Sequence, residues 1–151
     1  MSFVPDDFAV PDGLVTDRFR LVPLGPQHNE LDHAAWTSSI EHILATPGYA
    51  GSDWPPPGGM PLATNGEDLV QHARDFEQRT GFTYTVLERD GDDVLGCVYI
   101  YPSRSGEHDA SVHSWVRASA AELDAPLHDA VAAWLGERWP FERADYASRS
   151  R

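Results

Sequence analysis

Apolar and polar residues alternate most clearly in the second half of the chain, where the pattern predicts three strands. Residues 82–87 alternate bulky apolar or aromatic side chains with Thr, which is typical of a half-buried strand. The Asp-Gly turn within 89–92 is a strong hairpin signal, because Gly accepts the positive φ that such turns need. A second strand over 94–101 therefore pairs antiparallel with the first, and after the turn at 102–106 a third strand covers 109–117.

The first half of the chain predicts one strand and two helices. Residues 18–24 alternate apolar with polar positions, and Pro23 confines this strand to an edge or a strand end. Residues 27–45 follow a helical period, although imperfectly. A second helix begins at Asn65, an N-cap residue followed by acidic residues, and ends at Gly81.

The segment between these helices, residues 46–64, is rich in Pro and Gly and predicts a long loop. A loop of this length is usually functional or mobile. It carries Tyr49, Trp54 and Met60, which indicates that it packs on another part of the molecule. Two interpretations are open: a lid over a binding groove, or a surface loop anchored in the core by Trp54.

After the third strand, Ser119 or Asp124 caps another helix with an apolar stripe, and residues 143–147 form a last short strand. The order is therefore β-α-α-β-β-β-α-β. This order predicts an α+β fold, an antiparallel sheet with helices on its faces. Residues 1–17 are expected to form an irregular N-terminal arm, and residues 18–151 a single domain.

Composition narrows the classes of partner. The formal net charge is −13 and the chain contains no Lys, which argues against nucleic acid because phosphate binding needs a basic surface. No apolar run is long enough for a membrane span, and the N-terminus lacks the pattern of a secretory signal, so a cytoplasmic location is expected. The single Cys97 agrees with a reducing compartment and is expected to be a small buried apolar residue.

The predicted order and three segments resemble the GNAT superfamily, the acyl-CoA-dependent N-acetyltransferases. The segments are Phe19–Leu24 as first strand, the Asp-Gly hairpin leading into 94–100, and 110–117 entering a helix. The resemblance covers roughly residues 18–147. It implies the GNAT-like α+β sheet, which is mixed and mainly antiparallel, and the transfer of an acetyl or acyl group from CoA to a small-molecule amine.

The resemblance also implies where acetyl-CoA would bind. In the family, the strand corresponding to 109–117 lines the acyl-CoA groove, so Trp115, Val116, Arg117 and Ala118 are the expected cofactor-binding residues. Family members hold the CoA pyrophosphate in an Arg/Gln-x-x-Gly-x-Gly/Ala loop. Residues 119–126 contain no Gly, two carboxylates and a Pro, so this loop is degenerate here.

Candidate catalytic residues follow from the same alignment. Ser111 stands where many family enzymes carry an acidic general base, and His113 lies two residues along on the same strand face. An imidazole can deprotonate an amine directly or through water. Tyr99 and Tyr101 on the neighbouring strand can donate a proton to a leaving thiolate, although aromatic packing also explains them, and His113 can equally be structural.

Other sites and partners are more limited. The spacing of His28 and His33 does not match helical metal ligands, and 107–109 reads as a polar turn, so no metal is expected. Family members usually continue beyond the last strand with a further helix and strands, so the sheet edge is expected to be open and to allow a homodimer. Two functions stay open: an N-acetyltransferase, or a catalytically inactive GNAT-like module that binds a ligand or a partner and has lost CoA binding.

Overall fold

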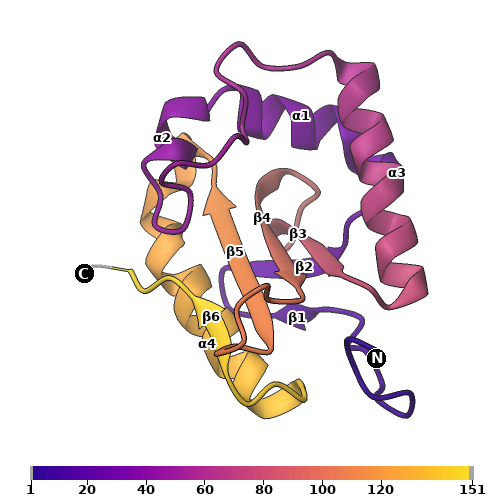
Figure 1. Ribbon diagram of the computed structural model, residues 1–151. Helices are drawn as coiled ribbons and strands as arrows, with labels where there is room; N and C mark the ends of the chain where they lie inside the picture. The colour runs from indigo at the N-terminus through magenta and orange to yellow at the C-terminus, as the bar shows by residue number, and fades with distance from the viewer. Residues whose placement is uncertain (1, 150–151) are drawn as a thin grey trace.

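A single six-stranded sheet forms the centre of the molecule. The computed structural model describes residues 2–149. The strands lie in sequence order: β1 (Leu14–Val15), β2 (Phe19–Pro23), β3 (Phe82–Glu88), β4 (Val94–Tyr101), β5 (Ala110–Val116) and β6 (Ala144–Tyr146). Neighbouring strands are antiparallel except for β5 and β6, which are parallel. The mixed, mainly antiparallel sheet that the sequence predicts is confirmed (Figure 1).

Helices cover both faces of this sheet (Figure 1). They are α1 (Asn29–Thr37), α2 (Ile40–Leu44), α3 (Leu62–Gln78) and α4 (Asp124–Arg138), with short 3₁₀ segments at Pro26–His28 and Ala118–Leu123. One apolar core, which includes Trp36, Cys97 and Trp115, lies on the side of α1 and α3. A second core, which includes Val112 and Leu127, lies on the side of α4. The molecule therefore has the layered α+β architecture expected from the sequence.

The register between β4 and β5 decides which side chains share a face. Three cross-strand pairs stand opposite one another: Cys97 with Trp115, Tyr99 with His113, and Tyr101 with Ser111. Because side chains alternate along a strand, all three pairs face the same side of the sheet, which is the side of α1 and α3. Ser114 consequently faces α4. The predicted strand face of His113 and Ser111 is thus confirmed.

The helices differ from the predicted ones at their boundaries. The single helix expected over 27–45 is wrong: α1 ends at Thr37 and α2 begins at Ile40. Ser39 lies between them with a non-helical φ of −134°, and its Oγ accepts a hydrogen bond from the amide of Ala118 at 2.8 Å. A residue that serves a distant turn in this way interrupts the local helix.

Asn65 is not an N-cap, which corrects the second helix prediction. Helix α3 begins three residues earlier, at Leu62, after Pro61 in an extended conformation. Asn65 is buried inside the helix, where its side chain accepts a hydrogen bond from Trp36 and donates one to Asp32. Tertiary hydrogen bonds have therefore replaced the capping role that its residue type suggests.

The N-terminal arm is mostly irregular and contains one short strand. Leu14–Val15 pairs with β2, so β2 is an inner strand and Pro23 stands at its end. Val4 is buried, and the Phe3 ring stacks on Phe82 and Phe141 with centroid distances of 5.9 and 5.2 Å. The arm therefore contributes to the core on the α4 side. Within residues 2–149, no helix is long and apolar enough to cross a membrane.

Candidate functional site

A cavity of about 310 Å³ lies between the β4–β5 face, helices α1 and α3, and the Pro/Gly-rich loop before α3. Its volume is at the lower end of the range typical of small-molecule sites. Its lining residues come from all of these elements: Leu24, Asp32, Gly48, Tyr49, Ser52, Trp54, Asn65, Asp68, Leu69, His72, Tyr99 and His113. We refer to this space as the β5 cavity.

Aromatic rings form much of the wall of the β5 cavity. Trp54, from the Pro/Gly-rich loop, packs 5.3 Å from Trp36 and 6.1 Å from Trp115 between ring centroids. Its ring also lies 6.2 Å from that of Tyr99 and 6.3 Å from that of Tyr49. Trp54 thus anchors the loop on the core and lines the cavity at the same time, so both interpretations of the loop describe part of the arrangement.

A buried carboxylate, that of Asp32, reaches the cavity from α1. The side chain is only 4% exposed, and its Oδ2 accepts a hydrogen bond from Nδ2 of Asn65 at 3.1 Å. Asn65 is itself held by Trp36, whose Nε1 donates to Oδ1 of Asn65 at 3.0 Å. Burial raises the pKa of Asp32 to about 6, and the hydrogen bond from Asn65 and the nearby His33 only partly oppose this rise. The sequence alone did not indicate Asp32 as a site residue, because its burial depends on the packing of α1 against α3.

The titratable side chains around Asp32 give the cavity a neutral to negative lining. Burial lowers the pKa of both His72 and His113, so both imidazoles are uncharged at neutral pH. Asp68 adds a carboxylate on α3, at an exposed position. Neither Arg nor Lys is found among the described lining residues. The cavity therefore does not suit an anion.

His113, the predicted general base, lies in the middle of β5 and lines the cavity. Its ring makes an edge contact with Tyr49 at 5.7 Å. The loop passes very close to it at Gly48, where φ is +99° and an added Cβ would lie 3.2 Å from Cδ2 of His113. A neutral imidazole facing a cavity is chemically able to accept a proton.

The other predicted catalytic residues are divided between the cavity and its surroundings. Tyr99 lines the cavity, its hydroxyl accepts a hydrogen bond from Nε1 of Trp115 at 3.0 Å, and burial raises its pKa. Tyr101 instead donates a hydrogen bond to Asp75 at 2.8 Å and contacts His72. Neither Tyr101 nor Ser111 is among the described lining residues. The structure thus brings His113 and Tyr99 together and leaves Ser111 and Tyr101 outside the cavity.

The predicted cofactor-binding residues lie at the end of β5 and are largely engaged within the chain. Trp115 and Val116 are fully buried. Arg117 donates to the carbonyl oxygen of Val94 at 3.2 Å. The amide of Ala118 donates to Ser39, as described above. The amide of Ala120, the first of two alanines in the following turn, donates back to the carbonyl oxygen of Arg117 at 2.9 Å. These two amides already have protein acceptors.

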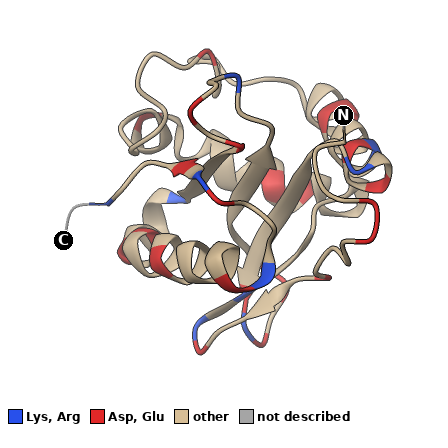
Figure 2. Cartoon of the chain, turned by 60° about the horizontal axis from the view of Figure 1, so that its bottom comes forward, with Lys and Arg blue, Asp and Glu red and all other residues tan. Residues whose placement is uncertain are grey.

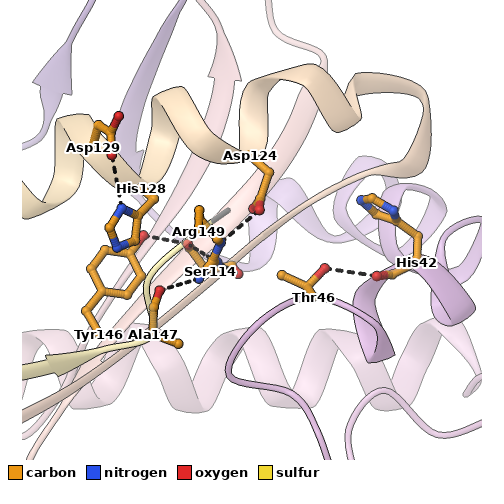
Figure 3. A network of polar contacts seen from close by, with 9 residues as sticks. All are labelled: His42, Thr46, Ser114, Asp124, His128, Asp129, Tyr146, Ala147 and Arg149. Carbon is orange, nitrogen blue, oxygen red and sulfur yellow. Dashed lines mark hydrogen bonds and ion pairs between the residues drawn. The ribbon is translucent and has the colours of Figure 1, made fainter. Parts of the chain in front are cut away.

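The other side of β5 carries a buried ion pair that the sequence did not indicate (Figure 3). Backbone pairing between β5 and β6 ends at Val112 and Tyr146, and beyond it the side chain of Arg149 lies against β5. Its Nη2 donates to the carbonyl oxygen of Ser114 at 2.9 Å, and its Nε donates to Oδ2 of Asp124 at 2.8 Å. We call this arrangement of Ser114, Asp124 and Arg149 the Arg149 lock.

The Arg149 lock is nearly closed to solvent. The Arg149 side chain is 3% exposed, and a third hydrogen bond joins its Nη1 to the carbonyl oxygen of Ala147 at 2.7 Å. Tyr146 contacts Ser114 through its hydroxyl and packs on the His128 ring at 4.3 Å. One position remains open, because Oδ1 of Asp124 is buried and has no hydrogen-bond partner within residues 2–149. The backbone carbonyl of Ser114 is therefore occupied by the chain itself.

Metal and thiol chemistry find no support in the described part of the chain. Residues 2–149 contain no group of three His, Cys, Asp or Glu side chains placed to hold a metal ion. Cys97 is fully buried on β4, and burial raises the pKa of its thiol, which disfavours a reactive thiolate. Cys97 is therefore a core residue.

Solved structures of acetyltransferases resemble this geometry, although the sequences are far apart. The ribosomal-protein-S5-alanine acetyltransferase from Vibrio fischeri superposes with a TM-score of 0.61 at 12% identity, over 82% of this chain and 66% of that one. The microcin C7 self-immunity acetyltransferase MccE, in complex with acetyl-CoA and AMP, gives 0.63 at 14% identity, over 85% and 67%. A putative ribosomal-protein-serine acetyltransferase from Vibrio cholerae gives 0.62 at 16% identity, over 95% and 74%.

These similarities define the class of fold. The chain has the GNAT fold of acyl-CoA-dependent acetyltransferases, which confirms the resemblance seen in the sequence. It spans about two thirds to three quarters of the length of these neighbours. No family model matches the sequence, and no curated protein matches it. The fold is thus shown by structure alone.

Proposed function

We propose that the protein is an N-acyltransferase that moves an acetyl or similar group from acyl-CoA to a small-molecule amine. The observation that carries this proposal is the position of His113: an uncharged imidazole in the middle of β5, facing the β5 cavity. In the GNAT superfamily the corresponding strand lines the acyl-CoA groove. Bound along β5, acetyl-CoA would place its thioester beside the cavity that holds the amine, with the backbone of Trp115 to Ala118 as the expected contact.

The chemistry needs one base and one proton source. His113 accepts a proton from the ammonium, directly or through water, and the free amine attacks the thioester carbonyl. A C–N bond forms, the C–S bond breaks, the attacking nitrogen gives up its second proton, and the CoA thiolate takes up a proton. Tyr99 can relay this proton from the nitrogen to the thiolate, because Tyr99 lines the cavity and its hydroxyl accepts a hydrogen bond from Trp115. Ser111 and Tyr101 have no step in this scheme.

His113→Gln tests the proposed base. Removing a general base lowers turnover by roughly 10²–10⁴-fold, so kcat for amine acetylation should fall by about this factor while the affinity for acetyl-CoA is unchanged. Because the pKa of His113 is lowered, the wild-type rate should hold below pH 6.5 before it declines with acidity. His108→Gln, in the turn before β5, is the matched control and should keep full activity. Unchanged turnover in the His113 variant would remove this residue from the mechanism.

A second candidate function is a GNAT-fold binding protein that no longer uses CoA. The Arg149 lock supports it, because Arg149 occupies the Ser114 carbonyl on the expected donor strand. The amides of Ala118 and Ala120 are also engaged, and the turn lacks the family's Gly residues. In this case the β5 cavity holds a ligand that is bound but not modified.

Titration with acetyl-CoA separates the two functions. At about 100 times its dissociation constant, a ligand that binds only the folded state stabilises it by roughly 2.7 kcal/mol. Acetyl-CoA should therefore raise the unfolding temperature by several degrees if it is a substrate. The absence of any shift at millimolar acetyl-CoA would exclude the transferase and leave the binding protein.

A further inference from the structure

We propose that the β5 cavity binds a compact organic cation, with the positively charged nitrogen paired to the carboxylate of Asp32 and resting against the rings of Trp54 and Tyr99. In a transferase this cation is the acceptor amine before deprotonation, and in a binding protein it is the ligand itself. The inference rests on the proposed function only for the fate of the cation. Binding can be measured without acyl-CoA, so the two proposals fail separately.

The negative charge of Asp32 is not balanced by a nearby cationic side chain of the described residues. Its carboxylate is nearly inaccessible and receives a hydrogen bond at Oδ2 from Asn65, yet within residues 2–149 no Arg or His lies within ion-pairing distance of it. A buried carboxylate without a counter-ion is costly, and proteins pair such groups or use them to bind cations. The cavity side of Asp32 is where a counter-ion can enter.

The same cavity has an aromatic wall. Faces of Trp and Tyr attract cations through the ring quadrupole, more strongly where water is excluded. Trp54, Tyr49 and Tyr99 all line the cavity, with the Trp54 centroid 6.2 Å from that of Tyr99 and 6.3 Å from that of Tyr49. A carboxylate and clustered aromatic rings that line one cavity favour an ammonium over a neutral polar group.

The charge of the lining residues and the volume of the cavity limit the kind of ligand that fits. Asp32 and Asp68 are the charged residues that line the cavity at neutral pH, since the two lining imidazoles are uncharged. An anion would meet two carboxylates and no cation among the described lining residues. A volume of about 310 Å³ holds only a small ligand or the end of a longer one. The group that the cavity binds is therefore both cationic and compact.

The test compares two probes that differ in a single charge. Choline carries a quaternary nitrogen, and 3,3-dimethylbutan-1-ol is its neutral carbon isostere, so their difference in affinity isolates the charge. Benzylammonium serves as a primary-ammonium probe. Binding is followed by calorimetry, and by intrinsic tryptophan fluorescence, to which Trp54 contributes, at neutral pH without acyl-CoA. At least one cation should bind saturably and at least tenfold more tightly than the neutral alcohol.

Two variants and a control locate the cation. Asp32→Asn keeps the oxygen that accepts from Asn65 and removes the charge, so cation affinity should fall at least tenfold. Trp54→Leu should weaken both cations with less effect on the alcohol. Glu67→Gln removes the same unit charge from an exposed position on α3 and should leave affinity within twofold. Thermal unfolding of each variant confirms that it is folded.

The pH profile adds a readout that a structural role of Asp32 would not give. Besides Asp32, the titratable groups that line the cavity are Tyr49 on the loop, Asp68 and His72 on α3, Tyr99 on β4 and His113 on β5. His33 on α1 and Cys97 on β4 also interact with Asp32 electrostatically. Protonation of the imidazoles weakens cation binding in every variant. The additional loss near pH 6 in the wild type should be absent from Asp32→Asn.

Three outcomes would overturn the inference. They are equal binding of the neutral isostere, unchanged cation affinity in Asp32→Asn, and no saturable binding of either cation at millimolar concentration. A cation that binds but is never acetylated contradicts only the transferase. Acetylation without measurable dependence on Asp32 contradicts only the cation site.

Discussion

Asp32 is a single carboxylate whose burial sets both the chemistry of the cavity and a stability cost. Its pKa is about 6 in the folded protein and 3.8 for the exposed residue. The folded state therefore binds more protons between these values, so stability falls as pH rises from about 4 to 6 and the full cost is present above that range. Two pKa units correspond to roughly 3 kcal/mol.

Asp32→Asn should remove this cost. We expect the free energy of unfolding at neutral pH to rise by up to roughly 3 kcal/mol, because the buried charge is gone while the hydrogen bond from Asn65 remains. The dependence of stability on pH between 4 and 6 should flatten at the same time. Urea unfolding across this pH range measures both effects. A variant less stable than the wild type at neutral pH would show that the carboxylate is already compensated.

Gly48 is a second residue whose position in the structure explains its residue type. Its φ of +99° and the distance of 3.2 Å between an added Cβ and Cδ2 of His113 both disfavour a side chain. Gly48→Ala should therefore cost about 1–3 kcal/mol of stability and displace the loop from His113. Gly51→Ala is the matched control, because Gly51 also has a positive φ of +74° but open space around it. Equal destabilisation of the two variants would mean that the contact with His113 contributes nothing.

Among the elements, the junction of β5, β6 and α4 depends on the Arg149 lock. Arg149→Ala leaves the Ser114 carbonyl and the Asp124 carboxylate without their donor, which should lower stability by about 2–3 kcal/mol because Asp124 is partly exposed. If acyl-CoA uses the Ser114 carbonyl, the same variant should bind acetyl-CoA more tightly than the wild type. Arg143→Ala, on the exposed approach to β6, is the control and should change neither quantity. Unaltered acetyl-CoA affinity would separate the lock from the donor site.

The observed helices and strands also show which elements local sequence patterns predict correctly. The alternation of side chains predicted β3, β4 and β5, because successive residues of a strand face opposite sides of the sheet and pack into one core or the other. The same period placed His113 with Ser111 on one face of β5 and Tyr99 with Tyr101 on one face of β4, and only the observed register shows that His113 and Tyr99 share a side of the sheet. Helix boundaries failed at Ser39 and Asn65, where hydrogen bonds to residues far along the chain override local preference.

The site residues that the sequence did not indicate are those defined only by packing. Asp32 looks like any acidic residue in a helix, and its function as a buried carboxylate appears only when α3 covers it. Arg149 lies 25 residues from Asp124 and 35 from Ser114, and nothing in its neighbourhood marks it. Long-range contacts of this kind leave no local signature in a single sequence.

At the scale of the whole molecule, carboxylates are spread over the helices and turns, and Arg residues are few (Figure 2). That the protein does not bind nucleic acid stays a prediction from the net charge of −13. The distribution of charge agrees with a cationic ligand, since the net charge of −13 attracts cations to the molecule before they reach the cavity.

The sheet edge at β6 bears on assembly. Within residues 2–149, β6 pairs only with β5, so its other side offers unpaired backbone groups. A homodimer through this edge stays our prediction, and light scattering at increasing concentration should show twice the monomer mass. Asp145→Pro in β6 should then shift the mass to that of the monomer, whereas Asp129→Asn on α4 should not. A monomer at all concentrations would contradict this mode of association.

The backbone at Gly48 has one further consequence. An added Cβ there would meet His113 of the cavity on one side and Ala147, next to the Arg149 lock, at 3.7 Å on the other. One loop thus lies against both the β5 cavity and the chain beside the Arg149 lock, so if acyl-CoA binds at the lock, filling either place restricts the same few atoms. Affinities for the two ligands should then be thermodynamically linked, and by reciprocity each ligand must change the binding of the other by the same factor.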